Sequence, residues 1–239
     1  MKINSKTLSD FIKKVTINGN ISDGILKFGP DGLTLTVKDV TNAGAVTGIL
    51  KATNFIDYSQ MNIPTKNKTT LISVLNNMNG NVELSKRDNV FILSSEGNEG
   101  KLIMPDEAYL ECDLPELPTL GHDGGFELDS GIWAAVKKNT QILGTGKVGV
   151  IAEVKDNVLY ITTGEDNFNQ LTAKTAVDYK NVVARFGSTF LEFITVMSGK
   201  LNVAFNDNYP ILITSRDPDS TIKWMISPII DTEAESEEE

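Results

Sequence analysis

Residues 5–17 read SKTLSDFIKKVTI, and the same arrangement returns 124 positions further along the chain. The apolar residues of this stretch follow the i, i+3, i+4, i+7 spacing of an amphipathic helix. They are Leu8, Phe11, Ile12 and Val15. Lys13-Lys14 matches Lys137-Lys138 at this offset, and Leu8 and Ile12 match Ile132 and Val136. The match predicts a second, related helix at about residues 130–143.

Two further correspondences keep the same order. A helix expected at 67–79 and one expected at 188–198 share their apolar positions and a closing glycine at an offset of 119. The tetrapeptides LIMP (102–105) and MISP (225–228) lie 123 positions apart. Between these segments run short β-rich stretches such as GILKF, GLTLTVKDV, KVGVIAEV and NVLYITT, separated by turn residues. Correspondences in one order with nearly constant offsets indicate an internal duplication.

The duplication predicts an α+β fold with two repeats, each with two helices packed on antiparallel sheet. We expect repeat 1 at residues 1–104, a connector at 105–125, repeat 2 at 126–230 and an acidic, disordered tail at 231–239. The connector, PDEAYLECDLPELPTLGHDGG, contains prolines that favour extended backbone, so it should cross the surface as a strap.

The composition argues against catalysis. Cys112 is the one cysteine and His122 the one histidine, which leaves no nucleophile–base pair and no zinc-ligand cluster. No glycine-rich phosphate loop or paired carboxylate spacing is present. We therefore expect no enzyme activity, no metal and no cofactor. The N-terminus has no apolar signal segment and no stretch is long enough to cross a membrane, which predicts a protein that is not secreted.

The charge distribution is less simple than the net charge of −10 suggests. Much of the negative charge lies in the tail, and exposed charges are screened beyond about 8 Å at physiological salt. On a helical projection, Lys6 and Lys13 point away from the apolar face of the first helix, with Lys14 on its flank. Lys137 and Lys138 do the same in the matching helix. An ordinary solvated face would explain either helix alone, but matched lysines in both repeats favour a surface for phosphates.

The connector and the last strand form a second candidate surface. Leu114, Leu117 and Leu120 are spaced by three, which aligns them in a polyproline-type extended helix. These leucines could tether the loop to its own domain. Alternatively, with Pro210, Met225 and Pro228 they frame an apolar groove for a partner's peptide.

Several of these motifs resemble a known family. DLPELPTL (113–120), DGLTLTVKDV (31–40) and YPILITSRDPDSTIKWMISPII (209–230) resemble the connector, an early strand pair and the closing segment of archaeal and eukaryotic proliferating cell nuclear antigen (PCNA). The opening MKINSKTLSDFIKKVTIN is similar to the start of the clamps of T-even phages. The chain thus resembles a DNA sliding clamp of phage or archaeal type.

The resemblance implies a homotrimeric ring whose helices surround duplex DNA without sequence preference. Such a ring is a processivity factor for a DNA polymerase, opened by a clamp loader ATPase, and binds other replication and repair proteins through short peptides. It would act at the nucleoid in the cytoplasm, in the host cell if the source is viral. A clamp-fold tether for transcription or repair, or a duplicated structural module without a DNA role, remain alternatives.

The resemblance also implies three sets of residues. The DNA-facing set is Lys6, Lys13, Lys14, Lys137 and Lys138. The partner-peptide groove is Val40, Leu117, Leu120, Pro210, Met225, Ser227 and Pro228. The subunit interface pairs Lys101, Leu102 and Ile103 of one chain with Lys174, Thr175 and Ala176 of the next. Two residues depart from the family pattern: Glu192 replaces a basic residue on the DNA side, and Lys38 lies near an apolar position of the groove.

Overall fold

The computed structural model describes residues 1–21, 24–39, 43–106, 117, 120–122, 124–129, 131–143, 149–165 and 168–229. The chain divides into two compact units. Unit 1 is Met1–Pro118 with Ser215–Lys223, and unit 2 is Thr119–Thr214 with Trp224–Glu239. The chain passes from unit 1 to unit 2 between Pro118 and Thr119, inside the predicted connector. The repeat boundaries at 104 and 126 therefore remain a prediction.

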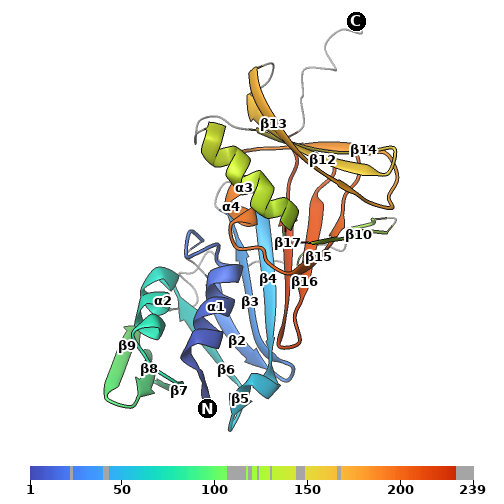
Figure 1. Cartoon of the computed structure of the whole chain (residues 1–239). Helices are drawn as coiled ribbons and strands as arrows, with labels where there is room; N and C mark the ends of the chain where they lie inside the picture. The colour runs from blue at the N-terminus through green and yellow to red at the C-terminus, as the bar shows by residue number, and fades with distance from the viewer. Residues whose placement is uncertain are drawn as a thin grey trace, which may run out of the picture. The chain divides into compact units, whose positions relative to one another are not determined.

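Unit 1 contains the helices and strands of the first half of the chain (Figure 1). Its elements are β1 (Lys2–Asn4), α1 (Ser5–Val15), β2 (Gly24–Gly29), β3 (Gly32–Lys38), β4 (Gly44–Lys51), a 3₁₀ turn (Ala52–Asn54), β5 (Phe55–Ile56), β6 (Met61–Thr65), α2 (Lys68–Asn76), β7 (Asn81–Arg87), β8 (Val90–Ser95) and β9 (Asn98–Ile103).

The second half of the chain repeats this order. Its elements are β10 (Phe126–Asp129), α3 (Gly131–Leu143), β11 (Gly149–Lys155), β12 (Val158–Glu165), β13 (Phe168–Ala176), β14 (Val182–Phe186), α4 (Thr189–Ile194), β15 (Lys200–Ala204), β16 (Ile211–Arg216) and β17 (Ser220–Ile226). The tip of the β16–β17 hairpin belongs to unit 1.

The sheet topology confirms the predicted duplication. In the first half the strands are ordered β1-β7-β8-β9 and β4-β3-β2-β6; in the second they are ordered β10-β15-β16-β17 and β13-β12-β11-β14. Apart from β5, which pairs with β1 and has no counterpart among the described strands of the second half, each strand has its counterpart at the same place, and the described pairs are antiparallel. The structure therefore confirms an α+β fold with two repeats of two helices on antiparallel sheet.

Helix α1 shows how the sequence forms this packing. The Asn4 side chain accepts hydrogen bonds from the backbone N–H groups of Lys6 and Thr7, which caps the helix. The buried face includes the four apolar residues predicted from the spacing. It lies very close to β4 at Gly48, where a Cβ would stand 2.9 Å from Phe11 Cε2 and closer still to Val15. Only glycine leaves room for this approach.

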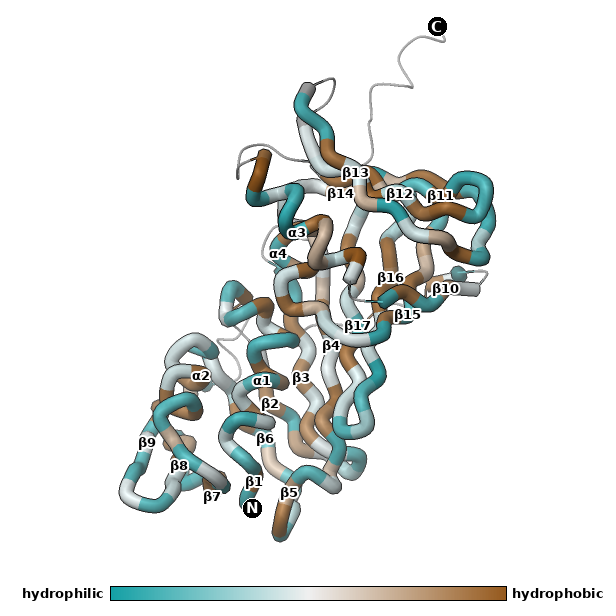
Figure 2. Tube along the Cα trace, in the orientation of Figure 1, coloured by the Kyte–Doolittle hydropathy of each residue, from teal (hydrophilic) through white to brown (hydrophobic). Residues whose placement is uncertain are grey.

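The strands under the helices bury one face. In β3, Leu33, Leu35 and Val37 are buried and alternate with half-buried threonines. Figure 2 shows apolar segments along β2, β3 and β4. A period of two with one apolar face is the pattern of a sheet covered on one side.

The structure departs from the predicted elements in three ways. Strands β1, β5, β6, β10 and β14 were not predicted, because short strands offer too little alternation to detect. Helix α2 ends at Asn76 rather than near residue 79. Helix α4 ends at Ile194 rather than near residue 198. Thr195 Oγ1 donates to the Glu192 carbonyl at 2.6 Å and the Thr195 and Val196 N–H groups bond three residues back, which tightens and stops the helix.

Candidate nucleic-acid interface and partner surfaces

The matched lysines of the two first helices make matched contacts. In unit 1, Lys13 Nζ donates to Asn76 Oδ1 at the end of α2, at 3.2 Å. In unit 2, Lys137 Nζ donates to the carbonyl oxygen of Thr195 just after α4, at 2.8 Å. Lys13 and Lys137 are 124 positions apart, and Asn76 and Thr195 are 119 apart, the offsets found in the sequence. In each unit the equivalent lysine donates a hydrogen bond to the equivalent position at the end of the second helix.

Asn76 links the two helices of unit 1 through a second hydrogen bond. Its Oδ1 also accepts a hydrogen bond of 2.8 Å from Ser9 Oγ, and Ser9 is fully buried. Lys13 lies 3.6 Å from the Asp10 carboxylate as well. These contacts restrict the Lys13 ammonium group, so it would lose less conformational freedom on meeting a phosphate than an unrestrained lysine.

The remaining three predicted lysines differ in their surroundings. Lys14 forms an ion pair of 3.3 Å with Asp217 in the hairpin tip of unit 1. The Lys6 and Lys138 side chains are exposed, and neither ammonium group forms a hydrogen bond or ion pair with the described residues. Lys13 and Lys14 also occupy the last turn of α1, where positive charge favours the helix dipole. Their assignment to DNA therefore stays a prediction beside this structural role.

Burial shifts the pKa of one of these lysines. Desolvation lowers the pKa of Lys137 from its ordinary value. The second helix of each unit adds little positive charge to this surface. On α4 the exposed residue Glu192 carries a negative charge instead. Lys68, which precedes the apolar run of α2 in the sequence, is fully buried, and its Nζ donates to the Thr65 carbonyl at 3.3 Å. No sequence signal marked Lys68 as a core residue.

Most of the predicted groove residues lie in unit 2. Leu120, Pro210, Met225, Ser227 and Pro228 are all half-buried there. Leu117 is half-buried and belongs to unit 1, and Val40 lies outside the described residues. The groove therefore remains a prediction.

Sequence reasoning missed two residues beside this surface. Tyr209 is 37% exposed and its ring meets His122 of the connector edge to face, with centroids 5.5 Å apart. Ile229 is 49% exposed, and its N–H donates to the Arg185 carbonyl on β14 at 2.8 Å. Tyr209 directly precedes Pro210 and Ile229 directly follows Pro228, and this position next to a predicted groove proline is the sequence signal that could have identified them.

The predicted subunit interface falls on two end strands of the described sheets. β9 ends one sheet and β13 ends another. Ile103 on β9 is 81% exposed, Lys101 is exposed and Leu102 is half-buried. On β13, Lys174 and Ala176 are exposed and Thr175 is half-buried. Open edges with exposed apolar residues are ready for pairing with another chain.

The described residues contain no group of three histidine, cysteine, aspartate or glutamate side chains arranged to hold a metal ion. Among the same residues, no helix is both long and apolar enough to span a membrane.

Comparison with solved structures identifies the fold. The chain is similar to PCNA from Entamoeba histolytica (TM-score 0.79, 16% identity, 96% of this chain and 98% of that one). It is similar to A. fulgidus PCNA bound by the C-terminal region of FEN-1 (TM-score 0.83, 15% identity, 98% and 99%). It is also similar to a chain of the PCNA2–PCNA3 complex from Sulfolobus tokodaii (TM-score 0.75, 16% identity, 95% and 99%). No family model and no curated protein sequence matches the chain. The PCNA-like sliding-clamp fold, which the resemblance implied, is thus confirmed.

Proposed function

We propose that this chain, which has the fold of PCNA, is a sliding clamp that confers processivity on a DNA polymerase. The observation that carries the proposal is the repeated contact of Lys13 with Asn76 and of Lys137 with Thr195. It indicates that the same helix face carries a restrained lysine in both repeats. The clamp would be a homotrimer that encloses duplex DNA, with no catalysis and no cofactor.

Enclosure makes strong contacts unnecessary. A protein that holds DNA by adhesion must neutralise many phosphates and loses about 10³–10⁵ in affinity between 50 and 200 mM salt. A closed ring is retained by topology and needs only weak contacts, which also let it slide. A net charge of −10 suits such a ring, because its exterior repels DNA while a few lysines face the enclosed duplex.

The groove would tether the polymerase and other replication or repair proteins. A short apolar-aromatic peptide fits a surface that presents half-buried Pro210, Met225 and Pro228 beside the exposed Tyr209. The A. fulgidus PCNA among the similar structures is bound by the C-terminal region of FEN-1, which supports a peptide-binding role. A clamp loader ATPase would open the ring on DNA without ends.

Threading on linear DNA tests enclosure. The protein is added to a linear duplex whose ends carry biotin, and streptavidin is added either afterwards or beforehand. A ring threads onto free ends and is then trapped, so protein remains bound at about 1 M salt, where the Debye length is about 3 Å. With the ends blocked first, no salt-resistant complex should form. Salt-resistant binding in both orders, or in neither, would refute enclosure.

The lysines are tested in the same assay at low salt. A variant with Lys6, Lys13, Lys137 and Lys138 changed to glutamine should thread more slowly and still be trapped. The matched control changes Lys27, Lys86, Lys155 and Lys223, which are exposed lysines on strands. A duplicated structural module without a DNA role predicts that neither variant changes anything and that no DNA is trapped.

A further inference from the structure

Two side chains of α1 bond the same atom of α2. The helices lie side by side in unit 1 (Figure 1), and Asn76 is the last residue of α2. Asn76 Oδ1 accepts hydrogen bonds from Ser9 Oγ at 2.8 Å and from Lys13 Nζ at 3.2 Å. Ser9 and Lys13 are four residues apart, so both extend from one face of α1. A buried hydroxyl and an ammonium group therefore share one acceptor at the exposed end of α2.

The equivalent contact in unit 2 shows what Ser9 adds. Lys137 donates to the backbone carbonyl of Thr195, and the chain itself fixes a backbone oxygen. A carboxamide at an exposed position rotates about two side-chain bonds, so it is a fixed acceptor only when a second bond holds it. Ser9 supplies that bond in unit 1. Its equivalent in unit 2, 124 positions along, is Trp133, a buried residue without a hydroxyl group. The hydroxyl is present in the repeat whose acceptor is a side chain.

The direction of the Ser9 bond agrees with this role. A serine within a helix often bonds the carbonyl four residues back on its own helix. Ser9 is fully buried and instead donates to a residue 67 positions away on the other helix. Ser9 thus orients the exposed Asn76 side chain from inside the protein.

The same bonds fix which way the Asn76 carboxamide faces. An ammonium group only donates hydrogen bonds, so the atom that Lys13 contacts is the carboxamide oxygen. The Asn76 amino group then points away from both donors, and it donates to no other residue in the described part of the chain. Donors on an amide oxygen also polarise the group and strengthen its N–H bonds as donors. The surface beside Lys13 therefore presents N–H donors from an ammonium group and an amide group together.

We propose that Ser9 and Asn76 position the Lys13 ammonium group for contact with a DNA phosphate, and that the Asn76 amino group donates to the same phosphate. Phosphate oxygens accept from lysine and asparagine side chains alike, and such contacts carry no base sequence. The inference rests on the proposed function. It adds to the DNA-facing lysines one neutral side chain that charge alone does not reveal.

One carboxylate competes for the same ammonium group. Asp10 Oδ1 lies 3.6 Å from Lys13 Nζ, and the Asp10 side chain is 50% exposed. An exposed ion pair of this kind contributes little and is screened by salt. A phosphate can therefore replace the carboxylate, whereas the bond from Lys13 to Asn76 stays in place.

A buried serine gives the sharpest test, because it cannot touch DNA itself. Binding of a short fluorescent duplex is followed by anisotropy at about 50 mM salt, where phosphate contacts are strong. Ser9→Ala should lower the affinity about threefold, in the range expected when one ordered side chain is released.

Ser5→Ala is the matched control. Ser5 is also buried on α1, and its Oγ donates to the Met78 carbonyl just after α2 at 2.8 Å. The change removes a buried bond between the same two segments without touching Asn76, so the affinity should stay that of wild type. Both variants are compared below their unfolding midpoints.

A double-mutant cycle separates positioning from a loss of stability. Asn76→Ala and Lys13→Gln should each weaken binding, and the double variant should be weaker than Lys13→Gln alone by no more than about twofold. Asn76→Ala changes no charge. It should nevertheless lower the slope of log affinity against log salt concentration, because that slope counts the phosphates that lysines neutralise.

Asn76→Asp tests the amino group. An aspartate keeps an oxygen for Ser9 and Lys13 and replaces the NH₂ donor by a second oxygen. Asn77→Asp adds the same charge at the exposed next residue, whose amino group donates to the Ser73 carbonyl of its own helix. Asn76→Asp should weaken binding about tenfold more than this control, as expected for a hydrogen bond to a charged group. Equal losses would show that the amino group does not contact DNA.

The outcomes separate the inference from the proposed function. Equal affinities of the Ser9→Ala and Ser5→Ala variants, additive losses in the cycle, or an unchanged salt slope would overturn the inference and leave the ring intact. A wild-type protein that binds the short duplex but is not trapped in the threading assay refutes the ring, and the variants still decide the inference. A wild-type protein that binds no duplex at low salt refutes both.

Discussion

Replacing Gly48 by alanine tests how α1 is held against its sheet. The added Cβ would stand 2.9 Å from Phe11 Cε2 and 3.0 Å from Phe11 Cζ, and closer still to Val15 Cγ2. Ordinary contacts between carbon atoms are about 3.5–4.0 Å. Because Phe11 is 3% exposed and Val15 is fully buried, neither side chain can turn aside without moving the helix.

The magnitude follows from two opposing effects. Overpacking a well-packed core costs about 1–3 kcal/mol. Alanine restricts the unfolded chain more than glycine does, which stabilises the fold by about 0.4–1 kcal/mol. The expected net loss in the free energy of unfolding is about 1–2 kcal/mol.

The assay is urea unfolding followed by far-UV circular dichroism, since both tryptophans, Trp133 and Trp224, lie in unit 2 and do not report on α1. Gly29→Ala on β2 is the control, because no atom lies within 4 Å of its added Cβ. It should change the free energy of unfolding by no more than about 0.5 kcal/mol.

Val15→Ala completes the test as a double-mutant cycle. It removes the methyl group nearest the new Cβ, so the double variant should lose at least about 1 kcal/mol less than the sum of the single losses. Additive losses, or a stability of Gly48→Ala equal to that of wild type, would show that α1 does not pack on Gly48.

Two further predictions address the charged and apolar surfaces. Titration of the Lys137 side chain by NMR should give a midpoint below the ordinary lysine pKa of about 10.4, because burial disfavours the charged form; a midpoint at or above that value contradicts it. Pro228→Asp should lower the affinity for an apolar-aromatic peptide at least tenfold in fluorescence polarisation while leaving the oligomer mass unchanged, and undiminished binding would remove the groove.

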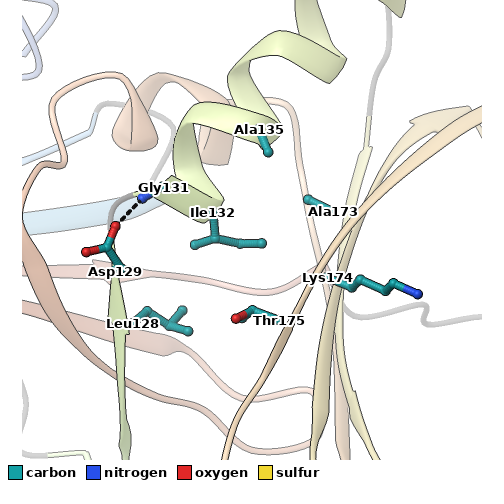
Figure 3. Close-up of a pocket in the computed structure, with 8 residues that line it drawn as sticks. All are labelled: Leu128, Asp129, Gly131, Ile132, Ala135, Ala173, Lys174 and Thr175. Carbon is teal, nitrogen blue, oxygen red and sulfur yellow. Dashed lines mark hydrogen bonds between the residues drawn. The ribbon is translucent and has the colours of Figure 1, made fainter.

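The sequence predicted the repeated architecture because the apolar positions of long amphipathic helices survive duplication. Leu8 and Ile12 match Ile132 and Val136 in the sequence; Leu8, Ile12 and Val136 are buried in the structure, and Ile132 is half-buried at a cavity beside β13 (Figure 3). The short strands escaped prediction because β1 has three residues and β10 has four, too few to show a period of two.

The sequence predicted which lysines belong to the candidate site. It did not predict which residues their side chains contact. The spacing showed that Lys13 and Lys137 lie opposite the apolar faces of their helices. It could not show that each reaches a residue about sixty positions away, because such contacts depend on how the helices pack. The burial of Lys68 and the cavity beside Ala135 depend on tertiary packing in the same way.

The two repeats agree and differ at informative places. They agree in the contact from the first helix to the second, although an asparagine side chain accepts the bond in unit 1 and a backbone carbonyl accepts it in unit 2. The hydrogen bond is retained although its acceptor differs. What the two repeats share is therefore the position of the lysine ammonium group, and not the kind of acceptor. They differ where Phe11 and Gly48 in one repeat correspond to Ala135 and Ala173 in the other. The first pair packs closely within unit 1, where Gly48 leaves room for the Phe11 ring, and the second borders a cavity of about 260 Å³ beside β13, so the same two positions of the duplicated fold are filled in one repeat and open in the other.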